Sequence, residues 1–461
     1  MWWPVQGSQK TPSIFEGKVP RSGPWRDGLH ISAFMQNATW MFLGQGFSLV
    51  CQAGYFICLG RLLGSTEYGI YVGAVALVAI LAQYSALGSH SVFLRYVSLD
   101  PERFARYWAN VLVTTVALGA SFAVLLAWAG PHVSRSYSHG MLACMAVGDC
   151  VCAQIILAAG RVFQAFDRMR VTALLNLLTN MLRAVLAATL LWTAHHAAAR
   201  QWVLATLIIS AVGMVIAVML VTRRFGKPDF SARLWKDRAG EGLVFAFSYS
   251  TTGICNDVDK AMLGHYGMNM ANGIYTMAYR VVDTCMMPIG AVHSAAFPRF
   301  FRMGADGAQS TCAFAQCILK KTAPTGLLLA MLMFVGAPLI PHFVGGSFGQ
   351  STAALRWLCL LPLFRSFHMS AGDALTGAGH QKLRLSTQTC AAILNFGANL
   401  YLIPHYGWLG AAWSSLGTDG MLAILNWTIL LWAKSNQLRP STNQVLVLPA
   451  TQASGCLTSS R

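Results

Sequence analysis

Long apolar stretches separated by short polar connections fill nearly the whole chain and limit the folds open to it. A helix needs roughly 20 apolar residues to cross a hydrocarbon core about 30 Å thick. Lipid cannot satisfy free backbone N–H and C=O groups, so each stretch is expected to be a helix. Twelve spans are predicted: Ala38–Leu59, Ile70–Gly88, Tyr107–Ala129, Met141–Ala159, Val171–Ala194, Trp202–Val221, Gly242–Leu263, Ile274–Phe297, Thr325–Phe343, Ala353–Leu375, Leu385–Leu402 and Leu409–Trp432.

Composition and charge exclude most soluble classes of protein. Of the 461 residues, 55% are hydrophobic and 11% are charged, whereas a soluble domain carries about a quarter charged residues. The net charge of +17 would indicate nucleic-acid binding in a soluble protein. Here, with the N-terminus placed in the cytoplasm, 25 of the 33 Lys and Arg residues fall in cytoplasmic segments. This positive-inside distribution predicts a multi-pass protein with both termini in the cytoplasm and no nucleic-acid partner.

An internal echo divides the chain into two halves of six spans. Leu63-Gly64 and Gly69-Ile70-Tyr71 follow the first span, and Leu263-Gly264 and Gly273-Ile274-Tyr275 follow the seventh. An offset of six spans, an even number, gives the two halves one orientation. Such parallel repeats are related by an axis along the membrane normal, and the substrate site is expected between them.

The predicted fold is an all-α integral membrane protein. It has about twelve transmembrane helices in two six-helix bundles, related by a pseudo-two-fold axis along the membrane normal. The predicted segments are a cytoplasmic tail (1–37), an N-terminal bundle (38–222), a charged cytoplasmic linker (223–241), a C-terminal bundle (242–433) and a second cytoplasmic tail (434–461).

Ionisable side chains within the spans are the candidate functional residues, because each costs at least about 2.5–3.5 kcal/mol to insert. Asp149 and Arg183 are predicted at matching depth on spans four and five. A hairpin between spans seven and eight would place Asp257 level with Arg280. Asp257 and Lys260 are also i,i+3 neighbours on one helix.

Two interpretations of these charges compete. In the functional one, a hydrated cationic cavity between the halves receives an anionic substrate, since a guanidinium pairs bidentately with phosphate. In the structural one, Asp149–Arg183 and Asp257–Arg280 are interhelical ion pairs. No acidic partner is evident at the depth of Arg365, which favours substrate contact there. The substrate-binding candidates are Arg365, Arg280, Arg183, Lys260 and His368.

A coupling proton or Na⁺ is a further candidate ligand, because burial raises the pKa of a carboxyl group. The ion-coupling candidates are Asp257, Asp259, Asp149 and Asp373. No catalytic residue, cofactor or metal site is expected. A Walker A sequence is absent, and the twelve scattered cysteines, of which Cys150 and Cys152 are the closest pair, lack metal-ligand spacing.

Several short motifs, in order along the chain, resemble one family. The segment Arg61–Gly69 (RLLGSTEYG) after the first span is similar to an element of polysaccharide-biosynthesis flippases of the Wzx, or O-antigen transporter, type. Phe297-Pro298-Arg299 also resembles this family. The strongest likeness runs from Ala374 to Ala412, where LTGAGHQKLRLSTQT is followed by ILNFGANLYLIPHYGWLGAA. The resemblance extends over spans one to twelve.

The resemblance implies membership of the multidrug/oligosaccharidyl-lipid/polysaccharide exporter superfamily, with two bundles in a V-shaped, alternating-access arrangement. It implies a flippase of the bacterial inner membrane that moves undecaprenyl-pyrophosphate-linked oligosaccharide repeat units from the cytoplasmic to the periplasmic leaflet. The product would feed O-antigen, capsule or exopolysaccharide synthesis. The implied partners are the lipid-linked oligosaccharide, membrane lipids and polysaccharide polymerase machinery.

Three alternatives stay open. A cation-coupled multidrug exporter of the same superfamily would favour an acidic and aromatic cavity, to which Asp257 and Asp259 could contribute. A lipid II flippase usually has more spans than this chain. A membrane glycan polymerase would need a large periplasmic loop with catalytic Arg or His residues, and the predicted external connections are short.

Overall fold

The computed structural model describes residues 27–98, 100–166, 168–194 and 196–436, which form helices joined by short turns. Every predicted span lies on helix, interrupted in places by a short turn. The helices are α1 (Asp27–Ser85), α2 (Ser89–Val97), η1 (Pro101–Arg103), α3 (Phe104–Val133), α4 (His139–Ala146), η2 (Val147–Ala153), α5 (Gln154–Ala165), α6 (Met169–Ala194), α7 (Ala199–Phe225), α8 (Ala232–His265), α9 (Asn269–Cys285), α10 (Met287–Gly304), α11 (Ala308–Gly336), α12 (Leu339–Val344), η3 (Gly346–Phe348), α13 (Ser351–Leu358), α14 (Leu361–Gly377), α15 (Gln381–Tyr406) and α16 (Trp408–Ser435).

Helix α1 contains the first predicted span and all but the last three residues of the second. Its helical geometry is broken at Gly64, which has φ 68° and ψ 175°. A positive φ favours glycine, which has no Cβ to clash. The chain turns back at this point, because the hydroxyls of Tyr55 and Tyr71 lie 3.3 Å apart, whereas sixteen residues of straight helix would extend about 24 Å.

The ninth predicted span, Thr325–Phe343, is displaced from the helix that forms it. Helix α11 begins at Ala308 and ends at Gly336. Lys320 and Lys321 lie within this helix. The two lysines lower the mean hydropathy of this part of the sequence, but charged residues do not end a helix. The predicted span, which was based on the apolar stretch alone, therefore begins too late.

The protein is a multi-pass, all-α membrane protein. By length and composition, seven helical segments of the described chain are apolar enough to cross a membrane. The other predicted spans are helical but contain more polar residues or are divided between shorter helices, as in α9 with α10 and α13 with α14.

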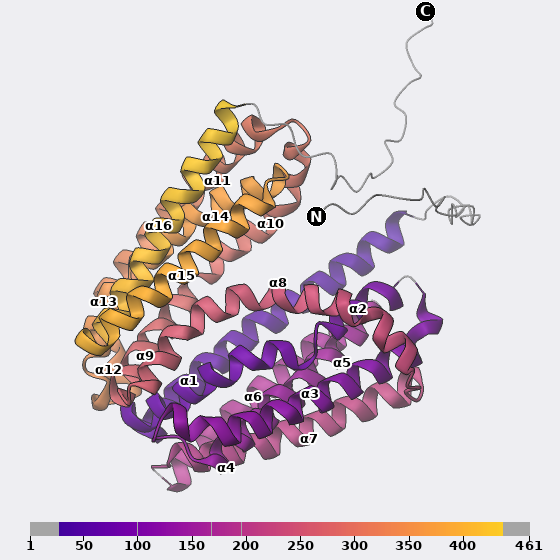
Figure 1. The fold of residues 1–461 in the computed structure, drawn as a ribbon, viewed down its shortest axis with the longest axis horizontal. Helices are drawn as coiled ribbons and strands as arrows, with labels where there is room; N and C mark the ends of the chain where they lie inside the picture. Colours follow the sequence, from indigo (N-terminus) through magenta and orange to yellow (C-terminus); the bar gives the residue numbers. More distant parts are fainter. Residues whose placement is uncertain (1–26, 99, 167, 195, 437–461) are drawn as a thin grey trace, which may run out of the picture.

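The helices form two lobes arranged as a V (Figure 1). Helices α1 to α7 make one arm, and α10, α11, α14, α15 and α16 make the other, while α8 runs between them. Helix α1 packs against α6 within its own arm and against α8 and α9 at the junction of the lobes. Two lobes are therefore observed, and the pseudo-two-fold axis stays a prediction.

Glycines of the echoed motif bring the lobes together at the vertex of the V. Gly69 of α1 lies against the Asn269 carbonyl of α9, and a Cβ on Gly69 would collide with that oxygen. A Cβ on Gly273 would collide with the Ser65 carbonyl. The Asn272 side chain also donates to the Gly69 carbonyl at 3.2 Å. Small residues allow this close backbone approach between membrane helices, so the repeated motif of one half crosses that of the other.

The charged segment 223–241, predicted to be a linker, is largely helical, because α7 ends at Phe225 and α8 begins at Ala232. The first turns of α8 pack against the N-terminal lobe. Glu241 accepts hydrogen bonds from Arg95 at 2.8 Å and from the Tyr96 hydroxyl at 3.0 Å. The Trp235 indole donates to the Thr114 hydroxyl at 2.9 Å. Helix α8 thus contacts the N-terminal lobe near its start and the C-terminal lobe, at α9 and α15, further along.

We predict that Gly273→Ala destabilises the closed vertex, because the added methyl has no space beside the Ser65 carbonyl. Overpacking of this kind costs roughly 1–3 kcal/mol. Gly290→Ala in α10 is the matched control, since nothing lies within 4 Å of its Cβ position. Thermal unfolding of the purified variants in detergent should show a lower midpoint for Gly273→Ala only. Equal midpoints would contradict the vertex packing.

Candidate functional site

A polar pocket of about 210 Å³ lies near the vertex, among α1, α4, η2, α6, α7 and α9. Helix α1 contributes three tyrosine rings, and η2 contributes Asp149. Helix α6 contributes Asn180 and Arg183, and α9 contributes Arg280. The tyrosines are Tyr55, Tyr68 and Tyr71. The structure therefore brings the predicted neighbours Asp149 and Arg183 to one cavity.

Two guanidinium groups give this pocket a cationic character. The Nε atoms of Arg183 and Arg280 are buried and have no hydrogen-bond partner among the described residues. The Arg280 guanidinium lies 4.9 Å from the centre of the Phe56 ring. Asp149 lines the same pocket and forms no ion pair with a described residue, so two cations face one carboxylate. An anion with several oxygens would supply the missing hydrogen bonds.

An apolar cavity of about 410 Å³ adjoins the polar pocket. It is lined by α1, α9, α11, α12 and α13, and it shares Phe56 and Arg280 with the polar pocket. Its apolar rim residues Leu332, Leu339 and Phe343 are exposed. We call this cavity the apolar groove. A single arginine therefore stands between a polar and an apolar environment.

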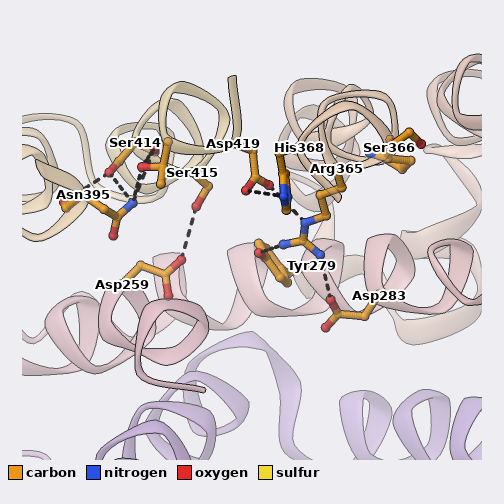
Figure 2. A network of polar contacts seen from close by, with 12 residues as sticks. Asp259, Tyr279, Asp283, Arg365, Ser366, His368, Asn395, Ser414, Ser415 and Asp419 are labelled. Carbon is orange, nitrogen blue, oxygen red and sulfur yellow. Dashed lines mark hydrogen bonds and ion pairs between the residues drawn. The ribbon is translucent and has the colours of Figure 1, made fainter. Parts of the chain in front are cut away.

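Arg365 of α14 is the centre of a separate network in the C-terminal lobe (Figure 2). Its Nε atom lies 3.0 Å from Asp419 of α16, and a second nitrogen lies 3.6 Å from Asp283 of α9. It also donates to the Tyr279 hydroxyl. His368 Nε2 lies 3.6 Å from the same Asp419 carboxylate. The prediction that Arg365 lacks an acidic partner is wrong, because the fold brings spans eight and twelve to span ten.

Lys260 and Asp257 of α8 lie beside this network. Their charged atoms are 3.2 Å apart, which confirms the i,i+3 pair. The structural interpretation, in which Asp257 and Arg280 form an interhelical ion pair, does not hold, because the ion-pair partner of Asp257 is Lys260. Arg280 instead lines the pocket of the N-terminal lobe, while the Lys260 ammonium lies 4.7 Å from the centre of the Tyr279 ring.

Asp259 is a buried carboxylate without an ion pair among the described residues. Its side chain accepts hydrogen bonds from the Tyr275 hydroxyl, from the Lys260 backbone N–H at 2.7 Å and from the Ser415 hydroxyl at 3.5 Å. The residue is 3% exposed. Burial disfavours an ionised carboxylate at this depth, whereas these three hydrogen bonds favour it.

Asp373 belongs to a different buried cluster. His293 Nδ1 lies 2.9 Å from one of its oxygens, and Arg384 lies 3.3 Å from the other. The candidate residues therefore fall into three groups rather than one cavity. Sequence reasoning did not select the pocket tyrosines, Asp283 or Asp419. The two acids could be seen as charges within spans, whereas nothing distinguishes the tyrosines from other apolar residues of a span.

The fold and the site define a class: an all-α, multi-pass membrane protein of two lobes, with a cationic pocket near their junction. Residues 34–304, more than half of the chain, match the family of polysaccharide biosynthesis proteins, and the chain belongs to that family.

One curated relative is a probable low-salt glycan biosynthesis flippase, Agl15, of Haloferax volcanii. It is 22% identical over 211 residues, which span 43% of this chain and 44% of the relative. The chain thus matches less than half of that relative's length.

Solved structures show the same fold. The inward-facing conformation of a multidrug resistance MATE family transporter matches with a TM-score of 0.63 and 15% identity, over 84% of this chain and 94% of that one. Its counterpart in the outward-facing conformation matches with 0.54 and 15%, over 87% and 96%. A superfamily transporter of Pyrococcus furiosus, described as having reverse polarity of its binding pocket, matches with 0.57 and 16%, over 88% and 95%.

We predict that Arg365 and Asp419 stabilise the fold as a coupled pair. Arg365→Ala leaves the Asp419 carboxylate without its guanidinium, and Asp419→Ala removes the acceptor of Arg365 Nε. The double variant should be less destabilised than the sum of the two single variants, with a coupling energy of about 0.5–3 kcal/mol. Unfolding free energies in mixed micelles measure it. Strict additivity would mean that the two side chains do not interact.

Proposed function

We propose that the protein is a flippase for undecaprenyl-pyrophosphate-linked oligosaccharide repeat units. It moves them from the cytoplasmic to the periplasmic leaflet of a bacterial inner membrane and delivers them to polysaccharide polymerase machinery. The observation that carries this proposal is the wall of Phe56 and Arg280, where the cationic pocket adjoins the apolar groove.

The chemistry of such a substrate explains why two adjoining cavities are useful. Pyrophosphate and sugars lose a large hydration free energy when they enter hydrocarbon, whereas the polyprenyl chain is apolar and stays in lipid without such a cost. Arg280, at the boundary of the two cavities, is suited to hold the pyrophosphate, and Arg183 offers a second guanidinium within the polar pocket. The apolar groove is suited to the first part of the chain.

The orientation of the V supports loading from the cytoplasmic side. Arg61, predicted on the external side, lies at the vertex and donates to the Phe343 carbonyl at 2.6 Å. The first residues of α1 and the last residues of α16 lie toward the open end of the V (Figure 1). With the positive-inside orientation, the open end faces the cytoplasm, which supports loading from that side. The higher TM-score to the inward-facing relative agrees with this state. Rocking of the lobes about the vertex would then complete alternating access.

The multidrug alternative is less well supported by the site. Two guanidinium groups line the polar pocket, and they repel a cationic drug. Of the C-terminal carboxylates, Asp257 pairs with Lys260, while Asp283 and Asp419 pair with Arg365.

Arg280→Ala should abolish export of surface polysaccharide and make the complete lipid-linked oligosaccharide accumulate in the cell. Loss of a charge-assisted pair costs about 1.5–3 kcal/mol, or roughly ten- to a hundredfold in affinity. Arg200→Ala, at the predicted external end of α7, is the matched control. Polyprenyl lipids extracted from a deletion strain carrying each variant give the answer. Normal surface polysaccharide in the Arg280→Ala strain, at the same protein level as the wild type, would contradict the role of Arg280.

Asp259 is proposed to bind the coupling proton or Na⁺, because it is 3% exposed and burial disfavours its ionised form. In proteoliposomes, a pH or sodium gradient should accelerate translocation by the wild type. Asp259→Asn should lose this acceleration and keep gradient-independent movement. Asp306→Asn, at an exposed turn, should behave as the wild type. An unchanged response of Asp259→Asn to both gradients would exclude coupling through this residue.

A further inference from the structure

We propose that residues 133–138, at the connection between α3 and α4, form a strap that holds the external side of the protein closed and detaches when that side opens. We call these residues the α3–α4 strap. They belong to the N-terminal lobe and reach across to the turn between α8 and α9. The proposal rests on the alternating access of the proposed function, and it goes further by naming contacts that keep one side closed.

Two hydrogen bonds tie the strap to the α8–α9 turn. His265 Nδ1, at the end of α8, donates to the Val133 carbonyl, and the two atoms are 2.6 Å apart. The Asn269 side chain, at the start of α9, donates to the Ser136 hydroxyl at 2.8 Å. Helix α9 also packs against α13 and α16, so these bonds join the N-terminal lobe to elements that contact the C-terminal lobe. Each can be exchanged for a bond to water at little net cost, which suits a contact that forms and breaks.

Tyr137 is the part of the strap that enters the protein interior. It is 2% exposed, and its hydroxyl lies where α1 and α8 approach each other most closely. A Cβ on Gly73 of α1 or on Gly264 of α8 would collide with this hydroxyl. The two glycines therefore leave a slot into which the end of the tyrosine ring fits. Gly264 belongs to the echoed Leu263-Gly264 motif, and the slot explains why a side chain has no space there.

Short-range hydrogen bonds shape the strap before it meets the slot. The Tyr137 N–H donates to the Ser134 carbonyl at 3.1 Å, and the Ser136 N–H donates to the Ser134 hydroxyl at 3.4 Å. The Ser138 hydroxyl accepts from the Met141 N–H at 3.3 Å and caps α4. All of these bonds lie within the N-terminal lobe. The strap can therefore leave the slot without losing its own turn.

The balance of forces on Tyr137 suits a contact that has to release. Burial of the ring favours the closed arrangement. The hydroxyl, however, has no hydrogen-bond partner among the described residues, and a buried hydroxyl without a partner opposes closure because it would bind water when exposed. The ring thus holds the strap in place while its polar end favours release.

The first test measures opening of the external side and needs no substrate. Ser65 is 4% exposed, and its carbonyl faces Gly273 across the junction of the lobes. Ser65→Cys therefore places a thiol at the closed vertex. In whole cells, a membrane-impermeant maleimide should label this thiol at least about tenfold faster when Tyr137→Ala empties the slot. Tyr137→Phe keeps the ring and should label no faster than Ser65→Cys alone, and protein without Ser65→Cys gives the background from native cysteines.

A disulfide provides a second test, which does not depend on the folding of Tyr137→Ala. Ser136→Cys combined with Asn269→Cys replaces the hydrogen bond between the strap and α9 with two thiols. An oxidant should cross-link them and stop translocation of lipid-linked oligosaccharide in proteoliposomes, and a reductant should restore it. Each single variant, treated in the same way, should continue to translocate.

The outcomes distinguish the strap from the function on which it rests. Equal labelling of Ser65→Cys with and without Tyr137→Ala would overturn the strap and leave the flippase proposal in place. Full translocation by the cross-linked protein, or failure of the two thiols to cross-link, would do the same. Absence of translocation by the wild type would overturn the proposed function, and the labelling rates would still decide whether the strap holds the external side closed.

Discussion

The inability of lipid to solvate charge is the constraint on which the rest of this structure depends. It requires helices throughout, because backbone groups must find partners within the chain. It also means that ionisable side chains persist within spans only where other protein groups or water surround them. The three groups of charged residues follow this rule, since each lies at a contact between helices or on a cavity wall. Their positions therefore mark where the bundle is polar.

Pairing divides these charges into two kinds. Arg365, Asp283 and Asp419 satisfy one another and join α9, α14 and α16. Arg183 and Arg280 retain unpaired donors beside a cavity. The cationic character of the interior is thus concentrated at the vertex, on the wall shared by the lobes, and does not extend over the C-terminal network. Under the proposed function, a substrate there would contact helices of the N-terminal lobe and Arg280 of α9, and alternating access places its site at such a junction.

The sequence predicted the helices well because hydropathy and the cost of buried backbone are local properties. The echo of Gly69 in Gly273 was also visible, although its meaning as a backbone contact between the halves required the fold. Pairings between distant spans could not be predicted, since depth along a helix leaves its rotation and neighbours unknown. The Asp257–Arg280 ion pair, one of the two interpretations of these charges, therefore does not form, and Arg365, which was expected to lack an acidic partner, pairs with two carboxylates. The tyrosines of the polar pocket carried no signal because aromatic residues are common in any span.

The most direct test of the central claim is translocation by the purified protein in proteoliposomes. Lipid-linked oligosaccharide is placed in the outer leaflet and its protection from an added glycosidase is followed, with a cationic amphiphile measured in parallel. The account predicts protein-dependent movement of the lipid-linked oligosaccharide and none of the cationic amphiphile. Movement of the cation alone would contradict it and assign the protein to drug export.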